Sequence, residues 1–188
     1  MKKSTVGIAA LSTGVTLGVV VAMYGPLVLQ HKPSQPYAGQ DVRQISSLSA
    51  DDVADLEKGS GWGLAKPAEL NGYPGPSHVL EFADKLELNS TQKTAVEGAF
   101  TAMQLKAKEL GAALITAESA LDEAFKNRSV TPTVLTERIA STEEIRAALR
   151  YVHLAAHLEV TPLLTEEQKT QYAALRGYGD GQDGHEGH

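Results

Sequence analysis

The sequence of 188 residues contains no cysteine, and aromatic residues make up only 5% of it. The absence of cysteine excludes disulfide bonds, thiolate metal sites, thiol catalysis and thioether-attached haem. A long basic run is also missing, and the formal net charge of −6 argues against nucleic acid as a partner. Alanine and leucine carry most of the apolar content, which favours helices over β-sandwiches or barrels.

Signatures of common enzyme classes are absent as well. The chain has no G-x-S-x-G nucleophile elbow, P-loop, H-E-x-x-H zinc motif or glycine-rich dinucleotide turn. The adjacent acids at 51–52 are interpreted as helix-start charges, and those at 143–144 as solvated helix residues. We therefore expect a protein that is not an enzyme.

Charge is also missing from residues 4–30, and this stretch is the most informative feature of the composition. It follows Lys2 and Lys3 and is predominantly apolar. A signal peptide has an apolar core of about 7–15 residues, whereas a spanning helix needs about 20, and this stretch is long enough to span. We interpret residues 1–30 as a signal peptide or a signal-anchor helix. In the second case residues 6–29 anchor the chain in the inner membrane, and in both cases the remainder is periplasmic.

The remaining chain divides into a linker, a helical domain and a tail. Residues 31–47 contain two prolines and a glycine and are typical of an extended linker. Residues 48–176 carry helical periodicity and form one domain. Residues 177–188 are rich in Gly, Asp and His, lack apolar periodicity and are expected to be disordered. This tail either captures metal weakly through its His and Asp side chains or serves only to keep the protein soluble.

Two similar sequences predict helix starts. Residues 88–92 (LNSTQ) and 164–168 (LTEEQ) each place a capping side chain three residues before a glutamine. The Asn or Thr oxygen accepts a hydrogen bond from a free N–H of the first turn, and the Gln reaches back to the N–H of the cap. A related pair, Ser49 and Asp52, predicts a short helix over 50–58.

Two long helices are expected between these boxes, with a break at 127–131. Apolar residues recur in both at alternating steps of three and four, which is a heptad pattern. In the first helix they are Val96, Phe100, Met103, Ala107, Leu110, Leu114, Ala117, Leu121 and Ala124. In the second they are Leu135, Ile139 (or Arg138 at this step), Thr142, Ile145, Leu149, Val152, Ala156 and Leu163. The pattern predicts an all-α fold with an antiparallel hairpin, and its length predicts a homodimer that buries the rest of the apolar stripe.

His153 and His157 lie one turn apart on the second long helix, so their side chains project from one face. Neutral imidazoles at this spacing can bind a Zn, Ni, Co or Cu ion, and the alternative is a solvated helix face. Glu143, Arg146 and Arg150 continue the same polar stripe. The two arginines offer a different interpretation, in which the stripe binds protein clients or anions.

The pair of boxes resembles the paired LTxxQ motifs of the periplasmic CpxP/Spy family. The likeness covers about residues 75–176, and the first box departs from the motif with Asn89 in place of Thr. The resemblance implies a hooked all-α hairpin with short flanking helices, an antiparallel dimer and no catalysis. The family includes ZraP/CnrX-like heavy-metal sensors as well as chaperones that bind misfolded proteins.

The resemblance also implies candidate metal ligands. His78 matches a first-helix histidine of the sensor-type members, and His153 matches the histidine on their later helix. His157 falls one turn on, where the sensor has a thioether ligand, and Glu97 lies near the position of its glutamate. A second first-helix histidine would fall at Phe82, so this ligand is missing.

The leading hypothesis is an exported, inner-membrane-tethered sensor or resistance protein of the envelope stress response. It would bind a divalent Zn, Ni, Co or Cu ion and act through an anti-sigma factor or a sensor kinase in the membrane. One alternative is an ATP-independent holdase chaperone that binds misfolded clients through Arg146 and Arg150, although the acidic balance of the exported part is unlike a strongly cationic cradle. The other is a purely structural, membrane-tethered helical dimer.

Overall fold

The computed structural model describes residues 35–178. The described residues fall into two units, 35–38 and 39–178. The expected signal peptide or anchor lies outside the described residues, and so does the tail from residue 179 onward. Within residues 35–178 the longest helices carry too many polar residues to cross a bilayer, and no span was found.

The all-α class is confirmed for the described residues. Residues 35–178 contain no β-strand, and their one isolated bridge joins Ile45 to Leu48. The helices are α1 (Ala50–Lys58), α2 (Lys66–Glu69), α3 (Pro76–Glu81), α4 (Ser90–Lys126), α5 (Pro132–Val160), the 3-10 turn η1 (Thr161–Leu163) and α6 (Glu166–Leu175).

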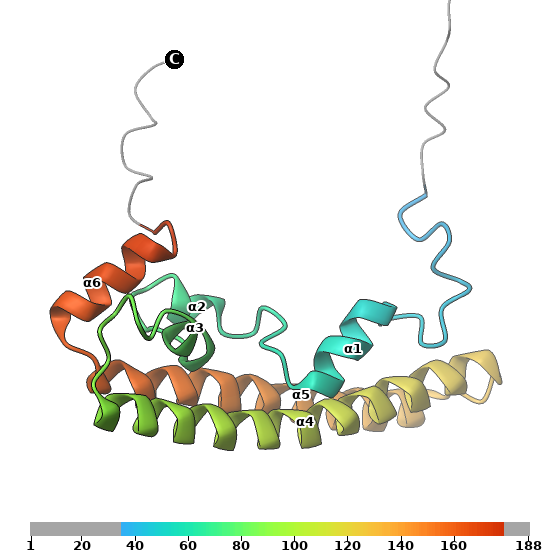
Figure 1. The fold of residues 1–188 in the computed structure, drawn as a ribbon. Coiled ribbons are helices and arrows are strands. Elements are labelled where there is room, and N and C mark those ends of the chain that lie inside the picture. The colour runs from blue at the N-terminus through green and yellow to red at the C-terminus, as the bar shows by residue number, and fades with distance from the viewer. Residues whose placement is uncertain (1–34, 179–188) are drawn as a thin grey trace, which may run out of the picture. The chain divides into compact units, whose positions relative to one another are not determined.

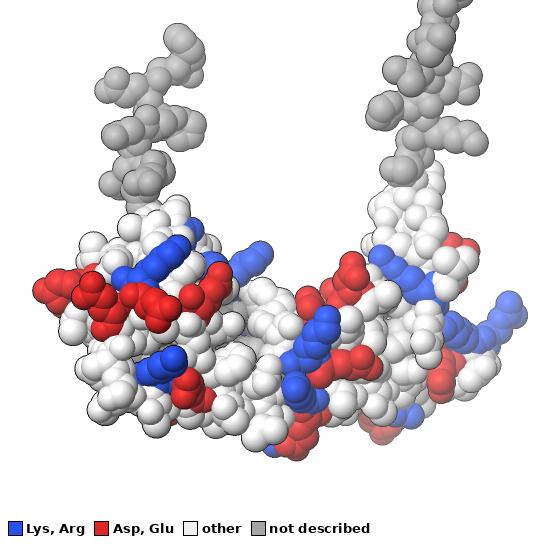
Figure 2. Space-filling view, viewed as in Figure 1, with Lys and Arg blue, Asp and Glu red and all other residues white. Residues whose placement is uncertain are grey.

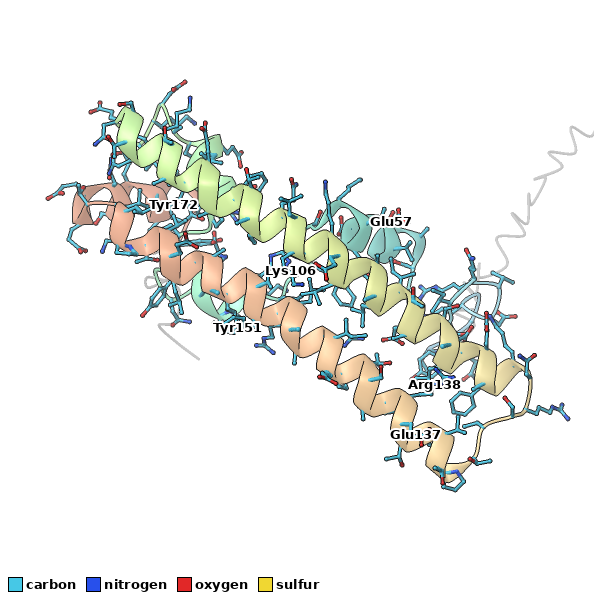
Figure 3. All side chains as sticks on the ribbon, turned by 90° about the horizontal axis from the view of Figure 1, so that it is seen from below. Glu57, Lys106, Glu137, Arg138, Tyr151 and Tyr172 are labelled. Atoms are coloured by element: carbon cyan, nitrogen blue, oxygen red, sulfur yellow. The ribbon has the colours of Figure 1, made fainter. Side chains whose placement is uncertain are left out.

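The long helices α4 and α5 lie side by side, and they form the base on which the other elements pack (Figures 1 and 3). Helix α4 has 37 residues, which makes it about 55 Å long. Of the predicted apolar positions, Ala107, Leu114 and Leu149 are among the most buried residues. The prediction is wrong at Ile139, which is 46% exposed, and Arg138, the alternative at this step, is exposed as well.

The three predicted capping boxes are present, and the two boxes that contain glutamine also bind each other. The Nε2 group of Gln92 donates to Oε1 of Gln168 at 2.8 Å and to the carbonyl of Leu163 at 2.8 Å. The Nε2 group of Gln168 donates to the carbonyl of Leu86 at 3.0 Å. Each glutamine therefore caps its own helix and ties the starts of α4 and α6 together.

We expect Gln168→Ala to lower the free energy of unfolding by about 2 kcal/mol, because it removes one cap interaction and leaves Gln92 without its cross-box partner. The matched control is Gln171→Ala, on the same helix, which removes one exposed hydrogen bond to the carbonyl of Lys85. Urea unfolding of both variants measures the difference. Equal losses would show that the contact between the boxes adds nothing to stability.

Short elements cover two separate parts of the long helices. At one end, Val79 of α3 and Tyr172 of α6 pack with Val96 of α4. Farther along, Leu56 of α1 packs with residues of α4 and α5. Ile45 is also buried in this second cluster, at 5% exposure, so the chain joins the core before the predicted end of the linker at residue 47.

Candidate functional site

A cavity of about 780 Å³ lies where α2, α3 and the loop after α1 cover α4 and α5. Its apolar wall includes Trp62, Phe100 and Met103. Three histidines predicted from the sequence line the same cavity: His78, His153 and His157. The fold thus brings a histidine from α3 to the pair on α5, across more than seventy positions of sequence.

His157 is buried and has a fixed orientation. Its Nδ1 lies 2.7 Å from the carbonyl oxygen of Tyr73. Because a carbonyl can only accept, Nδ1 carries the hydrogen in the neutral ring, and Nε2 is left with a free lone pair. A backbone carbonyl on the second ring nitrogen is the usual way in which proteins orient a metal-binding histidine.

His153 is the most deeply buried titratable group of the site, with 2% of its surface exposed. Its Nε2 is buried and has no hydrogen-bond partner among the described residues. Burial lowers the pKa of His153 below its usual value, and the neighbouring His157 lowers it further. The ring is therefore neutral near pH 7 and holds a nitrogen that nothing in the described protein satisfies.

His78 lies on α3, and its side chain is 38% exposed. Its Nδ1 is 3.7 Å from Oε1 of Glu69, which is too long for a hydrogen bond. Burial lowers the pKa of His78, and the charge of Arg176 lowers it too, while Glu69 opposes the shift. His78 is thus also neutral at physiological pH.

Glu69, the last residue of α2, is the residue of this site that the sequence analysis missed. Its Oε1 accepts hydrogen bonds from the hydroxyl of Tyr172 at 2.6 Å, from Nε of Arg176 at 2.9 Å and from the hydroxyl of Tyr178 at 3.0 Å. Burial by itself raises the pKa of Glu69, but these hydroxyls and Arg176 together lower it below its ordinary value. Glu69 is therefore an anion that joins α2 to α6. No spacing in the sequence signals this role.

The other predicted site residues lie elsewhere. Glu97 is exposed on α4 and does not line the cavity. Arg146 pairs with the buried Glu118, and its guanidinium lies 5.2 Å from the centre of the Trp62 ring. Arg150 is exposed. Of the two arginines proposed for client binding, Arg146 is therefore already engaged in contacts within the protein, and Arg150 is the exposed one.

The arrangement offers imidazole nitrogens and one carboxylate in a largely apolar cavity. Such a donor set suits Zn, Ni, Co or Cu better than Mg or Ca, which prefer oxygen ligands. In residues 35–178, however, no three side chains of this kind lie close enough together to hold a metal ion without movement.

Comparison with known proteins does not identify a family for this chain. No protein-family model, curated protein or solved structure matches the chain. The resemblance to the LTxxQ family therefore stays a prediction.

Proposed function

We propose that the protein is an exported, inner-membrane-tethered metal-binding protein of the sensor type. In this proposal His78, His153 and His157 bind a divalent transition-metal ion inside the cavity, and an anti-sigma factor or a sensor kinase in the membrane reads the bound state. The observation that carries the proposal is the buried Nε2 of His153, which has no hydrogen-bond partner among the described residues.

An unsatisfied buried nitrogen is costly, and a bound ion removes that cost. Leaving a buried polar group without a partner costs about 1–3 kcal/mol. His157 presents a second free Nε2 one turn away on the same face of α5, and both rings line one cavity. A metal ion would satisfy both nitrogens at once, whereas a structural role for the pair leaves Nε2 of His153 without a partner.

Metal binding requires the donors to move toward one another, because they are not preassembled. His78 is the donor with most freedom, since it is partly exposed on the short helix α3. We infer that binding draws α3 toward α5. A sensor needs such a difference between its free and bound states, because a ligand shifts only an equilibrium between states that it binds unequally.

The proposal includes the family architecture, a hooked hairpin that dimerises. The paired capping boxes and the neighbouring long helices support it. Exposed apolar side chains on the long helices, among them Leu105 at 67%, Tyr151 at 71% and Leu158 at 61%, offer surface that a second copy would cover.

Calorimetric titration with Zn²⁺, Ni²⁺, Co²⁺ and Cu²⁺ tests the function. The histidines at 31, 185 and 188 are first replaced with alanine in the full chain in detergent, which leaves only the three cavity histidines. We expect this background to bind one of the ions, and we expect His153→Ala with His157→Ala to weaken binding by about a hundredfold or more, since even outer-shell changes cost about 10–100-fold. Equal affinity in both proteins would refute the site.

A chaperone remains the second candidate, because Arg150 and Tyr151 are both exposed beside each other on α5. Acidic and basic side chains are interspersed over the face shown in Figure 2, which is unlike a strongly cationic client surface. Suppression of the aggregation of a denatured protein in the absence of metal, with no metal binding in the titration, would favour this alternative.

A further inference from the structure

We propose that Glu69, in place of Glu97, supplies the carboxylate ligand of the metal site, and that Gly75 allows the ring of His157 to lie beside it. This inference rests on the proposed function and names a ligand that neither the sequence pattern nor the resemblance assigned. Two independent observations carry it: a buried carboxylate oxygen without a partner, and a glycine whose position is explained by space alone.

The first observation concerns the two oxygens of Glu69. Oε1 accepts hydrogen bonds from Tyr172, Arg176 and Tyr178, so the carboxylate is held in one orientation. Oε2 is buried and has no hydrogen-bond partner among the described residues. Its nearest ionisable neighbour is Nδ1 of His157 at 3.8 Å, and that nitrogen already donates to a backbone carbonyl.

This pattern is the one expected of a metal-binding carboxylate. Ligating carboxylates are themselves hydrogen-bonded by surrounding groups, which fix their orientation and leave one oxygen for the ion. Arg176 also balances the charge of Glu69. Glu97 has neither feature, because it is exposed on α4 and away from the cavity.

The second observation concerns Gly75, which precedes α3. Its backbone has φ −84° and ψ 142°, an extended conformation that any residue adopts, so the backbone does not require glycine here. A Cβ atom at this position would lie 2.7 Å from Cε1 and 3.0 Å from Nε2 of His157, and 3.4 Å from Oε2 of Glu69. The ring of His157 therefore packs against the backbone of Gly75 with the free oxygen of Glu69 close by, and any side chain at position 75 would displace the ring.

The residues that meet at Gly75 come from separate elements. Glu69 ends α2, Gly75 precedes α3 and His157 lies on α5. An ion held between Glu69 and His157 would lie in the cavity. His78, the first residues of α3 and His153 line the same cavity. The site would then consist of nitrogen ligands and one carboxylate, a combination found in zinc proteins.

Two matched pairs of variants test the inference by Zn²⁺ titration, in the full chain that carries alanine at 31, 185 and 188. Glu69→Gln removes the charge of the proposed ligand, and Glu97→Gln removes the charge of the one predicted from the sequence. Gly75→Ala displaces the ring of His157 from its place beside Glu69, whereas Gly98→Ala adds the same methyl group where no atom lies within 4 Å. We expect Glu69→Gln and Gly75→Ala each to weaken Zn²⁺ binding by about tenfold or more, and both controls to bind like the background.

The outcomes separate this inference from the function on which it rests. If the background does not bind Zn²⁺, the proposed function fails and the inference fails with it. If the background binds and Glu69→Gln binds equally well, or Glu97→Gln is the weaker variant, the inference alone is overturned. Circular dichroism checks that each variant is folded. Should Glu69→Gln unfold, Glu69→Asp decides the question, because it keeps the charge but withdraws the carboxylate from the histidines, and unchanged Zn²⁺ affinity would overturn the inference.

Discussion

Gly111→Ala should lower the free energy of unfolding by about 2 kcal/mol, although alanine is the better helix former. Gly111 lies in the middle of α4, where the end of α1 crosses it. A Cβ atom there would lie 2.9 Å from the carbonyl carbon of Leu56 and closer still to its oxygen. These are backbone atoms, so α1 has to move. Leu56, which is 1% exposed, then loses its packing.

The sign of this effect follows from comparing two magnitudes. Alanine gains about 1 kcal/mol over glycine inside a helix. Forcing extra volume into a packed contact costs about 1–3 kcal/mol. At Gly111 the cost lies at the upper end of this range or above it, because the obstructing atoms belong to the backbone of α1. The loss therefore exceeds the gain at Gly111.

Gly98→Ala is the control, because it makes the same change in the same helix where no atom obstructs the methyl group. It should raise the free energy of unfolding by up to about 1 kcal/mol. Urea unfolding of both variants gives the two signs. If both variants were stabilised, α1 would not pack on α4 as described.

Glu118→Ala should also be strongly destabilising, by about 3 kcal/mol. The side chain of Glu118 is 8% exposed and accepts hydrogen bonds from Arg146 and from the hydroxyl of Ser47 at 2.8 Å. Removing one partner of a buried pair costs about 3–5 kcal/mol, and the lower value applies because Arg146 keeps 31% of its side chain exposed. Ser47 would lose its long-range partner as well.

Glu143→Gln is the matched control, since Glu143 is the exposed partner of the same arginine. An exposed pair contributes about 0–1 kcal/mol, so this variant should unfold almost like the parent. Thermal and urea unfolding measure the contrast. A small effect at Glu118 would mean that Arg146 is not committed to the core, and Arg146 would again be a candidate for client binding.

The sequence predicted best those features that depend on neighbouring residues. The caps at Ser49, Asn89 and Thr165 form as expected, because each requires only residues three positions apart. The break between the long helices and the apolar pattern of α4 are local as well. His153 and His157 could be paired for the same reason, since one helical turn fixes their separation.

Contacts between distant segments could not be predicted in this way. Glu69 joins α2 to Tyr172 and Arg176 more than a hundred residues later, and no periodicity links these positions. The hydrogen bonds between Gln92 and Gln168 could not be predicted either, because the capping box of its own helix already accounts for each glutamine. The likeness to a sensor family directed attention to Glu97, while the packing of α2 places Glu69 beside the histidines.

Nitrogen-15 NMR of the histidine rings during Zn²⁺ titration tests the central claim most directly, because it observes the proposed ligand atoms themselves. Before metal is added, Nδ1 of His157 should carry a hydrogen, and His153 should be neutral. On addition of Zn²⁺, the Nε2 signals of His153 and His157 should shift together and saturate together. If only the histidines at 31, 185 and 188 respond, the cavity does not bind the metal and the account is contradicted.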